Sequence, residues 1–147
     1  MSYALSVTVS DSFDDTVTRT VNALAEQGFG VLTTIDLQKV LAEKIGMTIP
    51  RQLLLGACRP QLAGAALEAE PSIGLLLPCN VTVQEINGAR TQVQILDPSV
   101  MISLTNNPAL LPMAEDAGHR LSLVLAALGE PPSPVDSPAS GASVTAN

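Results

Sequence analysis

The segment most informative about the fold is Val81-Thr82-Val83-Gln84-Glu85-Ile86-Asn87-Gly88-Ala89-Arg90-Thr91-Gln92-Val93-Gln94-Ile95-Leu96. Two segments of alternating apolar and polar residues, 81–86 and 91–96, flank the dipeptide Asn87-Gly88. Asn-Gly between alternating segments is the strongest short-range signal for a β-hairpin. The sequence therefore predicts an antiparallel strand pair, and Asp97-Pro98 marks its end.

Strand-like and helix-like segments alternate before the hairpin, and one more helix follows it. Ser12, with Asp15 three positions later, is typical of a helix start, and Gly28 is typical of the end of that helix. We expect further strands over 3–9, 30–35 and 53–57, a short helix over 37–45 capped by Asp36, a helix from Pro60, and a last helix over 112–128.

Apolar residues at helical spacing predict which side of each helix is buried. The predicted buried positions are Val17, Val21, Leu24 and Ala25 in the first helix, Leu37, Val40 and Leu41 in the second, Leu62, Ala63, Ala66 and Leu67 in the third, and Ala117, Leu121, Val124, Leu125 and Leu128 in the last.

The order of elements, βαβ(α)βαββα, predicts an α+β fold in two layers. It has an antiparallel-containing sheet with helices on one face. The strand over 81–86 points Val81 and Val83 to one side and Thr82 and Gln84 to the other. The second face of the sheet is therefore semi-polar, and we expect a homodimer through that face or through a sheet edge.

Length and composition indicate one folded domain, residues 1–129, in a chain of 147 residues. Residues 130–147 are rich in Pro and Ser and show no apolar periodicity, so we expect a disordered tail. The net charge is −7 and aromatic residues make up 2% of the chain. This composition argues against nucleic acid or an anionic membrane surface as a partner.

The N-terminal residues lack the basic and then apolar pattern of a secretory signal, and no apolar run approaches the roughly 20 residues that span a bilayer. We therefore expect a soluble, cytoplasmic protein without membrane contact. In that compartment Cys58 and Cys79 are expected to be free thiols rather than a structural disulfide.

The two cysteines mark the candidate site, because each stands beside a proline at the end of an apolar run. Such positions lie where strands meet loops, and sites are commonly built there. A helix beginning at Pro60 and the neighbouring Arg59 would both favour a thiolate at Cys58. Asn80 follows Cys79 and can turn its amide to a ligand or to its own backbone.

The motifs Gly56-Ala57-Cys58-x-Pro60, Glu70-Pro71, Ile73-Gly74-Leu75-Leu76-Leu77-Pro78-Cys79-Asn80-Val81 and Asp97-Pro98 resemble those of the domain of unknown function 302 family. Gly28-Phe29-Gly30 fits the same pattern, and the resemblance extends over roughly residues 3–128. It implies a small homodimeric α+β domain and no established reaction. The family more often has Asn where this sequence has Arg59.

Two functions follow as hypotheses. The first is a binding or sensing module in which Cys58, Arg59, Cys79 and Asn80 hold a small anionic or thiol-reactive ligand. The alternative is a thiol-dependent redox or sulfur-handling protein with Cys58 as nucleophile and Cys79 as resolving thiol. A third possibility is that both cysteines are simply packed in the core.

Other candidate groups carry weaker signals. Two thiols are half of a tetrahedral zinc site, and His119 or a second chain could complete it, but no short-spaced Cys/His cluster is present, so we predict no metal. Asp97 is typical of a turn, and Glu70 precedes the second cysteine segment. With no Walker loop, dinucleotide motif or Ser/His/Asp order, the sequence indicates no particular cofactor and leans against an enzyme.

Overall fold

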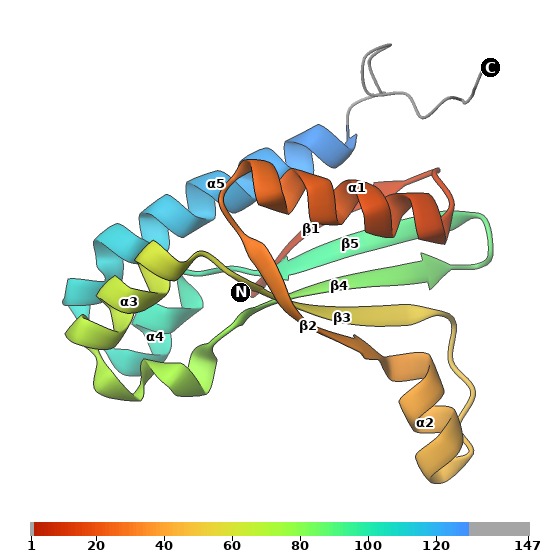
Figure 1. Cartoon of the computed structure of the whole chain (residues 1–147), viewed down its shortest axis with the longest axis horizontal. Coiled ribbons are helices and arrows are strands. Elements are labelled where there is room, and N and C mark those ends of the chain that lie inside the picture. The colour runs from red at the N-terminus through yellow and green to blue at the C-terminus, as the bar shows by residue number, and fades with distance from the viewer. Residues whose placement is uncertain (1, 130–147) are drawn as a thin grey trace.

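The computed structural model describes residues 2–129, and it has a five-stranded sheet with the strand order β1-β5-β4-β3-β2 (Figure 1). Every neighbouring pair is antiparallel. The strands are β1 (Ala4–Val9), β2 (Gly30–Asp36), β3 (Gln52–Cys58), β4 (Cys79–Ile86) and β5 (Arg90–Leu96). The predicted α+β class and element order are confirmed.

The two longest helices, α1 (Phe13–Glu26) and α5 (Leu111–Gly129), lie together over one face of the sheet (Figure 1). The remaining helices lie at the ends of the sheet; they are α2 (Leu37–Ile45), α3 (Pro60–Ala69) and α4 (Val100–Thr105). Two 3₁₀ turns, η1 (Pro71–Leu76) and η2 (Pro108–Leu110), complete the described part of the chain. Neither turn was predicted, nor was α4, because each is too short to show a period.

The predicted hairpin is present as β4 and β5. Asn87 and Gly88 both have positive φ angles, 42° and 76°, as a tight hairpin turn requires. The register pairs Val83 with Val93 and Val81 with Ile95, so apolar residues face apolar residues across the two strands. A slip of one residue would turn all of them to the other face, which is why this pattern specifies the register.

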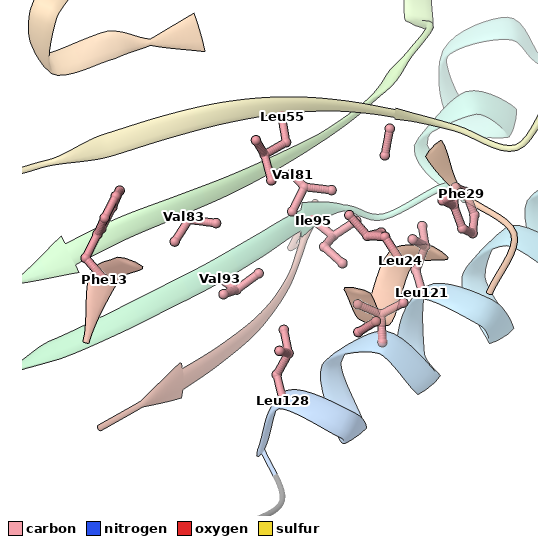
Figure 2. Packing of buried hydrophobic residues seen from close by; sticks show 13 residues of the cluster. Phe13, Leu24, Phe29, Leu55, Val81, Val83, Val93, Ile95, Leu121 and Leu128 are labelled. Carbon is pink, nitrogen blue, oxygen red and sulfur yellow. The ribbon is translucent and has the colours of Figure 1, made fainter. Parts of the chain in front are cut away.

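The main core lies between the sheet and the helices α1 and α5. Figure 2 shows the side chains of Leu55, Val81, Val83, Val93 and Ile95 pointing from β3, β4 and β5 toward this layer. The core is aliphatic, with Phe13 and Phe29 at its margins; Leu24, Leu121, Val124 and Leu128 cover it from the helices.

The buried side of α1 differs from the predicted one. Thr16 and Thr20 are buried, whereas Val21 and Ala25 are exposed. Each threonine hydroxyl donates to the carbonyl four residues earlier, Thr16 to Ser12 and Thr20 to Thr16, at 2.7 Å in both cases. These internal bonds satisfy the hydroxyls, so threonine occupies core positions that a count of apolar residues cannot detect.

A second, smaller core joins the helices at one end of the sheet. Its buried members come from α3, η1, α4, η2 and α5: Ala66, Ile73, Met101, Leu110 and Ala114. Of the predicted face of α3, Ala66 is buried and Leu62 and Ala63 are half-buried, while Leu67 is exposed, so that position was wrong.

Helix α2 has the predicted bounds but not the predicted burial. The Asp36 side chain accepts a hydrogen bond from the Lys39 amide at 3.0 Å, and Gly46 ends the helix with φ 67°. No residue of α2 is buried, and in Figure 1 the helix projects from the sheet away from the other helices. We call β2, α2 and residues 46–49 the arm.

The predicted tail, residues 130–147, lies outside the described residues. Among residues 2–129, no helix is both long enough and apolar enough to cross a membrane.

Candidate functional site

The antiparallel pairing of β3 and β4 brings the two cysteines to the same end of the sheet. Ala57 is the register partner of Cys79, and Cys58 follows Ala57 as the last residue of β3. A helix and a 3₁₀ turn separate the cysteines along the chain, but the cysteines lie on adjacent strands of the sheet. The thiols are half-buried and no disulfide joins them.

A small pocket opens where the cysteines meet the helices at this end. It lies between the main core, represented by Phe29 and Ala57, and the smaller core around Met101. The lining residues come from β3, β4, three helices and the segments between them: Phe29, Ala57, Cys58, Arg59, Leu62, Ala63, Ala66, Leu77, Cys79, Met101, Met113 and Ala117. We call this the sulfur pocket.

The sulfur pocket is narrow and mostly apolar. Its total free space is about 390 Å³ when the part open to solvent is included, but the centre of a water-sized sphere can move through only about 30 Å³ of it. That space suits one or two small atoms or groups rather than a nucleotide or a sugar.

Arg59 is the charged residue of the lining. It precedes α3, whose first residue is Pro60, and its side chain packs on the loop that follows α1. A Cβ built on Gly28 would lie 3.0 Å from the Arg59 Nε, so glycine at that position leaves room for the side chain. Within the described residues the Nε is buried and has no hydrogen-bond partner. An unsatisfied buried donor of this kind is uncommon in a native structure.

The pKa of the Cys79 thiol is raised above its usual value. Burial is the main cause, because it disfavours the charged thiolate, and the nearby Cys58 adds to the effect by charge repulsion. Cys79 is therefore a protonated thiol at neutral pH. The β3–β4 register pairs Cys79 with Ala57, the residue that precedes Cys58, so the two cysteines are neighbours in the sheet.

Asn80 is placed apart from the other predicted site residues. Its neighbours Cys79 and Val81 point toward the helix layer, and residues alternate between faces along a strand. Asn80 is exposed and is not part of the pocket lining. The structure thus brings together Cys58, Arg59 and Cys79, and leaves Asn80 outside.

The weaker candidates have structural contacts away from the thiols. His119 is exposed on α5 and does not line the pocket. The Asp97 carboxylate accepts a bond from the Ser99 amide at 2.9 Å, as in an ordinary turn. The Glu70 carboxylate accepts a bond from the Asn107 side chain at 2.8 Å, which ties the end of α3 to η2.

Met101 and Met113 are lining residues that the sequence did not single out. They lie on α4 and α5, 43 and 55 positions beyond Cys58 by residue number, so no spacing motif links them to it. The one available signal is composition, because both cysteines and two of the four methionines of the chain meet in this pocket.

No group of three or more His, Cys, Asp or Glu side chains within residues 2–129 is arranged to hold a metal ion. The sulfur pocket contains two such residues, Cys58 and Cys79. A site of the usual zinc type is therefore not formed by one chain over this range.

Comparisons with known proteins agree with the predicted resemblance. The crystal structure of an uncharacterised conserved protein DUF302 from Bacillus stearothermophilus superposes with a TM-score of 0.81 at 30% identity, covering 87% of this chain and 99% of that one. No match was found among curated proteins. The model of the family described as domain of unknown function DUF302 matches residues 5–128, and the chain therefore belongs to this family.

Proposed function

We propose that this domain is a binding or sensing module, and that the sulfur pocket takes a small thiol-reactive ligand at Cys58 and Cys79. The observation that carries the proposal is the meeting of both cysteines in one pocket next to a buried, unpartnered Arg59 Nε. An unpaired donor at a pocket wall is a ready contact for a group that arrives with the ligand.

The lining supports binding rather than catalysis. Among residues 2–129, no carboxylate or imidazole lines the pocket, so this part of the chain supplies no general base beside the thiols. The ligand is small, because the free space admits few atoms. The proposal also places the protein in a reducing compartment such as the cytoplasm, where two unpaired cysteines persist.

Methyl methanethiosulfonate tests this function, because it transfers only a methylthio group to a thiol. The full-length reduced protein is treated at neutral pH, and the modified peptides are followed by mass spectrometry. We expect modification of the folded chain well before global unfolding, with Cys58→Ser and Cys79→Ser locating the reactive thiol. Labelling of both thiols that proceeds only at the rate of unfolding would overturn the proposal.

A thiol redox function is the second candidate, and the β3–β4 register favours it by placing the thiols on adjacent strands. In this scheme the Cys58 thiolate attacks a small-molecule disulfide, forms a mixed disulfide and releases one thiol. Cys79 then displaces the second thiol, giving a Cys58–Cys79 disulfide. The raised pKa of Cys79 suits a resolving thiol rather than the attacking one.

The redox scheme is tested with oxidised glutathione under controlled potential. Formation of the internal disulfide lowers the mass of the chain by two hydrogens, and dithiothreitol restores it. In Cys79→Ser, glutathione must remain as a mixed disulfide at Cys58. If the same mixed disulfide is stable in the wild type, the resolving role of Cys79 is refuted.

We further propose that the protein is a homodimer in which a second copy covers the arm. Large apolar side chains are exposed there: Leu32 at 66%, Ile35 at 45%, Ile45 at 68% and Met47 at 48%. Strand β2 is also an edge strand of the sheet formed by residues 2–129, and an edge strand can pair with a strand of another chain.

Light scattering after size exclusion tests the dimer. The wild-type chain is expected at twice its 15.2 kDa mass, and Ile45→Asp is expected to be a folded monomer because α2 buries no side chain. Leu104→Asp, an exposed apolar residue on α4 rather than the arm, is the matched control and should remain dimeric. A monomeric wild type at micromolar concentration would contradict the proposal.

A further inference from the structure

The sulfur pocket contains four sulfur-bearing side chains from four different elements: Cys58 of β3, Cys79 of β4, Met101 of α4 and Met113 of α5. Met101 is 8% exposed and Met113 is half-buried, so both belong to the packed end of the molecule. Met47, in contrast, lies on the exposed arm.

The donor chemistry of this lining is soft. Thiolate and thioether sulfur select Cu(I), whereas Mg²⁺ and Ca²⁺ require several oxygen ligands and structural zinc requires four Cys or His donors. Apart from Arg59 and the four sulfur residues, the lining side chains that the described range 2–129 supplies are hydrocarbon. Such a wall also keeps water away from a bound ion.

The size of the sulfur pocket is also compatible with a single metal ion. A free space of about 30 Å³ for the centre of a water-sized sphere is enough for one metal ion.

Charge balance links Arg59 to the same occupant. Two thiols bind Cu(I) with the loss of two protons, 2 RSH + Cu⁺ → [Cu(SR)₂]⁻ + 2 H⁺, and the bis-thiolate complex carries one negative charge. The guanidinium of Arg59 carries one positive charge, and its buried Nε has no partner within the described residues. The pair is neutral, which favours burial of both groups at this apolar site.

We propose that the thiol-reactive ligand of the sulfur pocket is a single Cu(I) ion, bound by Cys58 and Cys79 with Met101 and Met113 as weaker thioether ligands and Arg59 as the counter-charge. This inference rests on the proposed binding function and names the ligand class of the same site. Ag(I), which has the same charge and softness, is its redox-stable probe.

The test is an anaerobic titration of the reduced full-length protein with Cu(I) against the chromophoric chelator bicinchoninate, with native mass spectrometry to count ions per chain. We expect one ion per chain, with Ag(I) taken up in the same ratio, and loss of uptake in Cys58→Ser and in Cys79→Ser. Affinity should fall as the pH is lowered, because two protons compete with the metal.

Conservative variants separate the roles of the other residues. Met101→Leu and Met113→Leu each should weaken Cu(I) binding by roughly tenfold, about 1.4 kcal/mol, while Met47→Leu on the arm leaves it unchanged. Arg59→Met should weaken binding about 10- to 100-fold, as the loss of an outer-shell partner does. Thermal unfolding of each variant without metal shows whether it is folded.

The outcomes distinguish this inference from the function on which it rests. No uptake of Cu(I) or Ag(I), with methyl methanethiosulfonate still reacting in the folded chain, overturns the metal and retains the thiol site. Failure of both probes overturns both proposals. Unchanged affinity in both methionine variants removes the four-sulfur assignment.

Discussion

Helices α5 and α2 each have an apolar side, but the two sides differ in burial. Five residues of α5 are buried against the sheet and its neighbours, whereas α2 buries none. Ile45, near the end of α2, is 68% exposed, while Leu121 of α5 is fully buried. The apolar residues of α2 have the same spacing as those of a helix that packs on a core. Their side chains are therefore either covered by another molecule or exposed to water.

The difference shows that amphipathic spacing predicts a helix and its apolar side but not what covers that side. Helix α5 returns across the sheet beside α1, and the two shield the same face (Figure 1). Helix α2 connects two antiparallel neighbours, β2 and β3, and projects beyond the sheet (Figure 1). The same kind of substitution in α5 and in α2 is therefore expected to have different effects on stability.

The largest difference is expected from truncation of one side chain in each region. Leu121→Ala should lower the free energy of unfolding by about 2–5 kcal/mol, because it leaves a cavity in the main core. Ile45→Ala should change it by no more than about 0.5 kcal/mol in the monomer, as for other surface positions. Urea denaturation measures both.

The effect of Ile45→Ala on the free energy of unfolding should be measured at several protein concentrations. If Ile45→Ala lowers the free energy of unfolding more strongly at higher protein concentration, a second copy covers the arm and its binding contributes to stability. A large decrease in the free energy of unfolding that does not depend on concentration would mean that Ile45 is packed within the monomer, and the contrast in burial between α5 and α2 would be wrong.

A glycine pair tests how tightly the arm is attached to the sheet. A Cβ at Gly56 of β3 would overlap Thr33 Oγ1 of β2 and lie 2.8 Å from Pro78 Cγ. Gly56→Ala should therefore destabilise the fold by about 1–3 kcal/mol through overpacking. Gly64→Ala, inside α3 with nothing within 4 Å, is the control and should instead stabilise it by about 0.5–1 kcal/mol.

Thermal unfolding compares the two glycine variants with the wild type. If Gly56→Ala is as stable as the wild type, β2 can move away from β3 at little cost, and the arm is looser than its pairing indicates.

A smaller effect is expected from the two helix caps. Ser12 Oγ accepts a bond from the Asp15 amide at 3.1 Å, and Asp36 caps α2 in the same way. Ser12→Ala should lower global stability by about 1 kcal/mol, because α1 is part of the main core. Asp36→Ala should mainly increase the local opening of α2, since that helix contributes few buried contacts.

Hydrogen exchange separates local from global opening. Faster exchange confined to residues 37–45 in Asp36→Ala is the expected pattern. Faster exchange throughout the sheet in this variant would show that the arm is coupled to the main core.

The smallest effect is a pH dependence at the packed end. The pKa of Cys79 is raised in the folded state, so the folded chain holds this proton more firmly than the unfolded chain. The free energy of unfolding should therefore fall as the pH rises above about 8.5, the usual pKa of a thiol, toward the raised folded value. Cys79→Ser should remove this part of the fall, and a wild type and variant with parallel profiles in chemical denaturation would refute it.

Local sequence signals were sufficient where the physical cause is local. The Asn87-Gly88 turn and the Ser12 and Asp36 caps were all predicted, because each depends on backbone angles or bonds within a few residues. The burial of Thr16 and Thr20 was missed, since a hydroxyl bonded within its own helix behaves as an apolar group.

The candidate site was predicted in part. Cys58, Arg59 and Cys79 were identified from their place beside prolines and strand ends, and they line one pocket. Asn80 was predicted with them but points the other way, because successive residues of a strand alternate between faces. The contribution of Met101 and Met113 could not be predicted, because it depends on how α4 and α5 fold back onto β3 and β4.

The α+β class and the hairpin follow from the sequence alone, because alternation, helical spacing and turn residues act over short distances. The sequence also singles out Cys58 and Cys79 as candidate site residues, through their position at strand ends. Tertiary contacts determine that α5 is covered and that α2 is not. They also bring together in one small pocket the residues Cys58, Arg59, Cys79, Met101 and Met113. Those outcomes depend on contacts between segments far apart in the chain, and no local pattern records them.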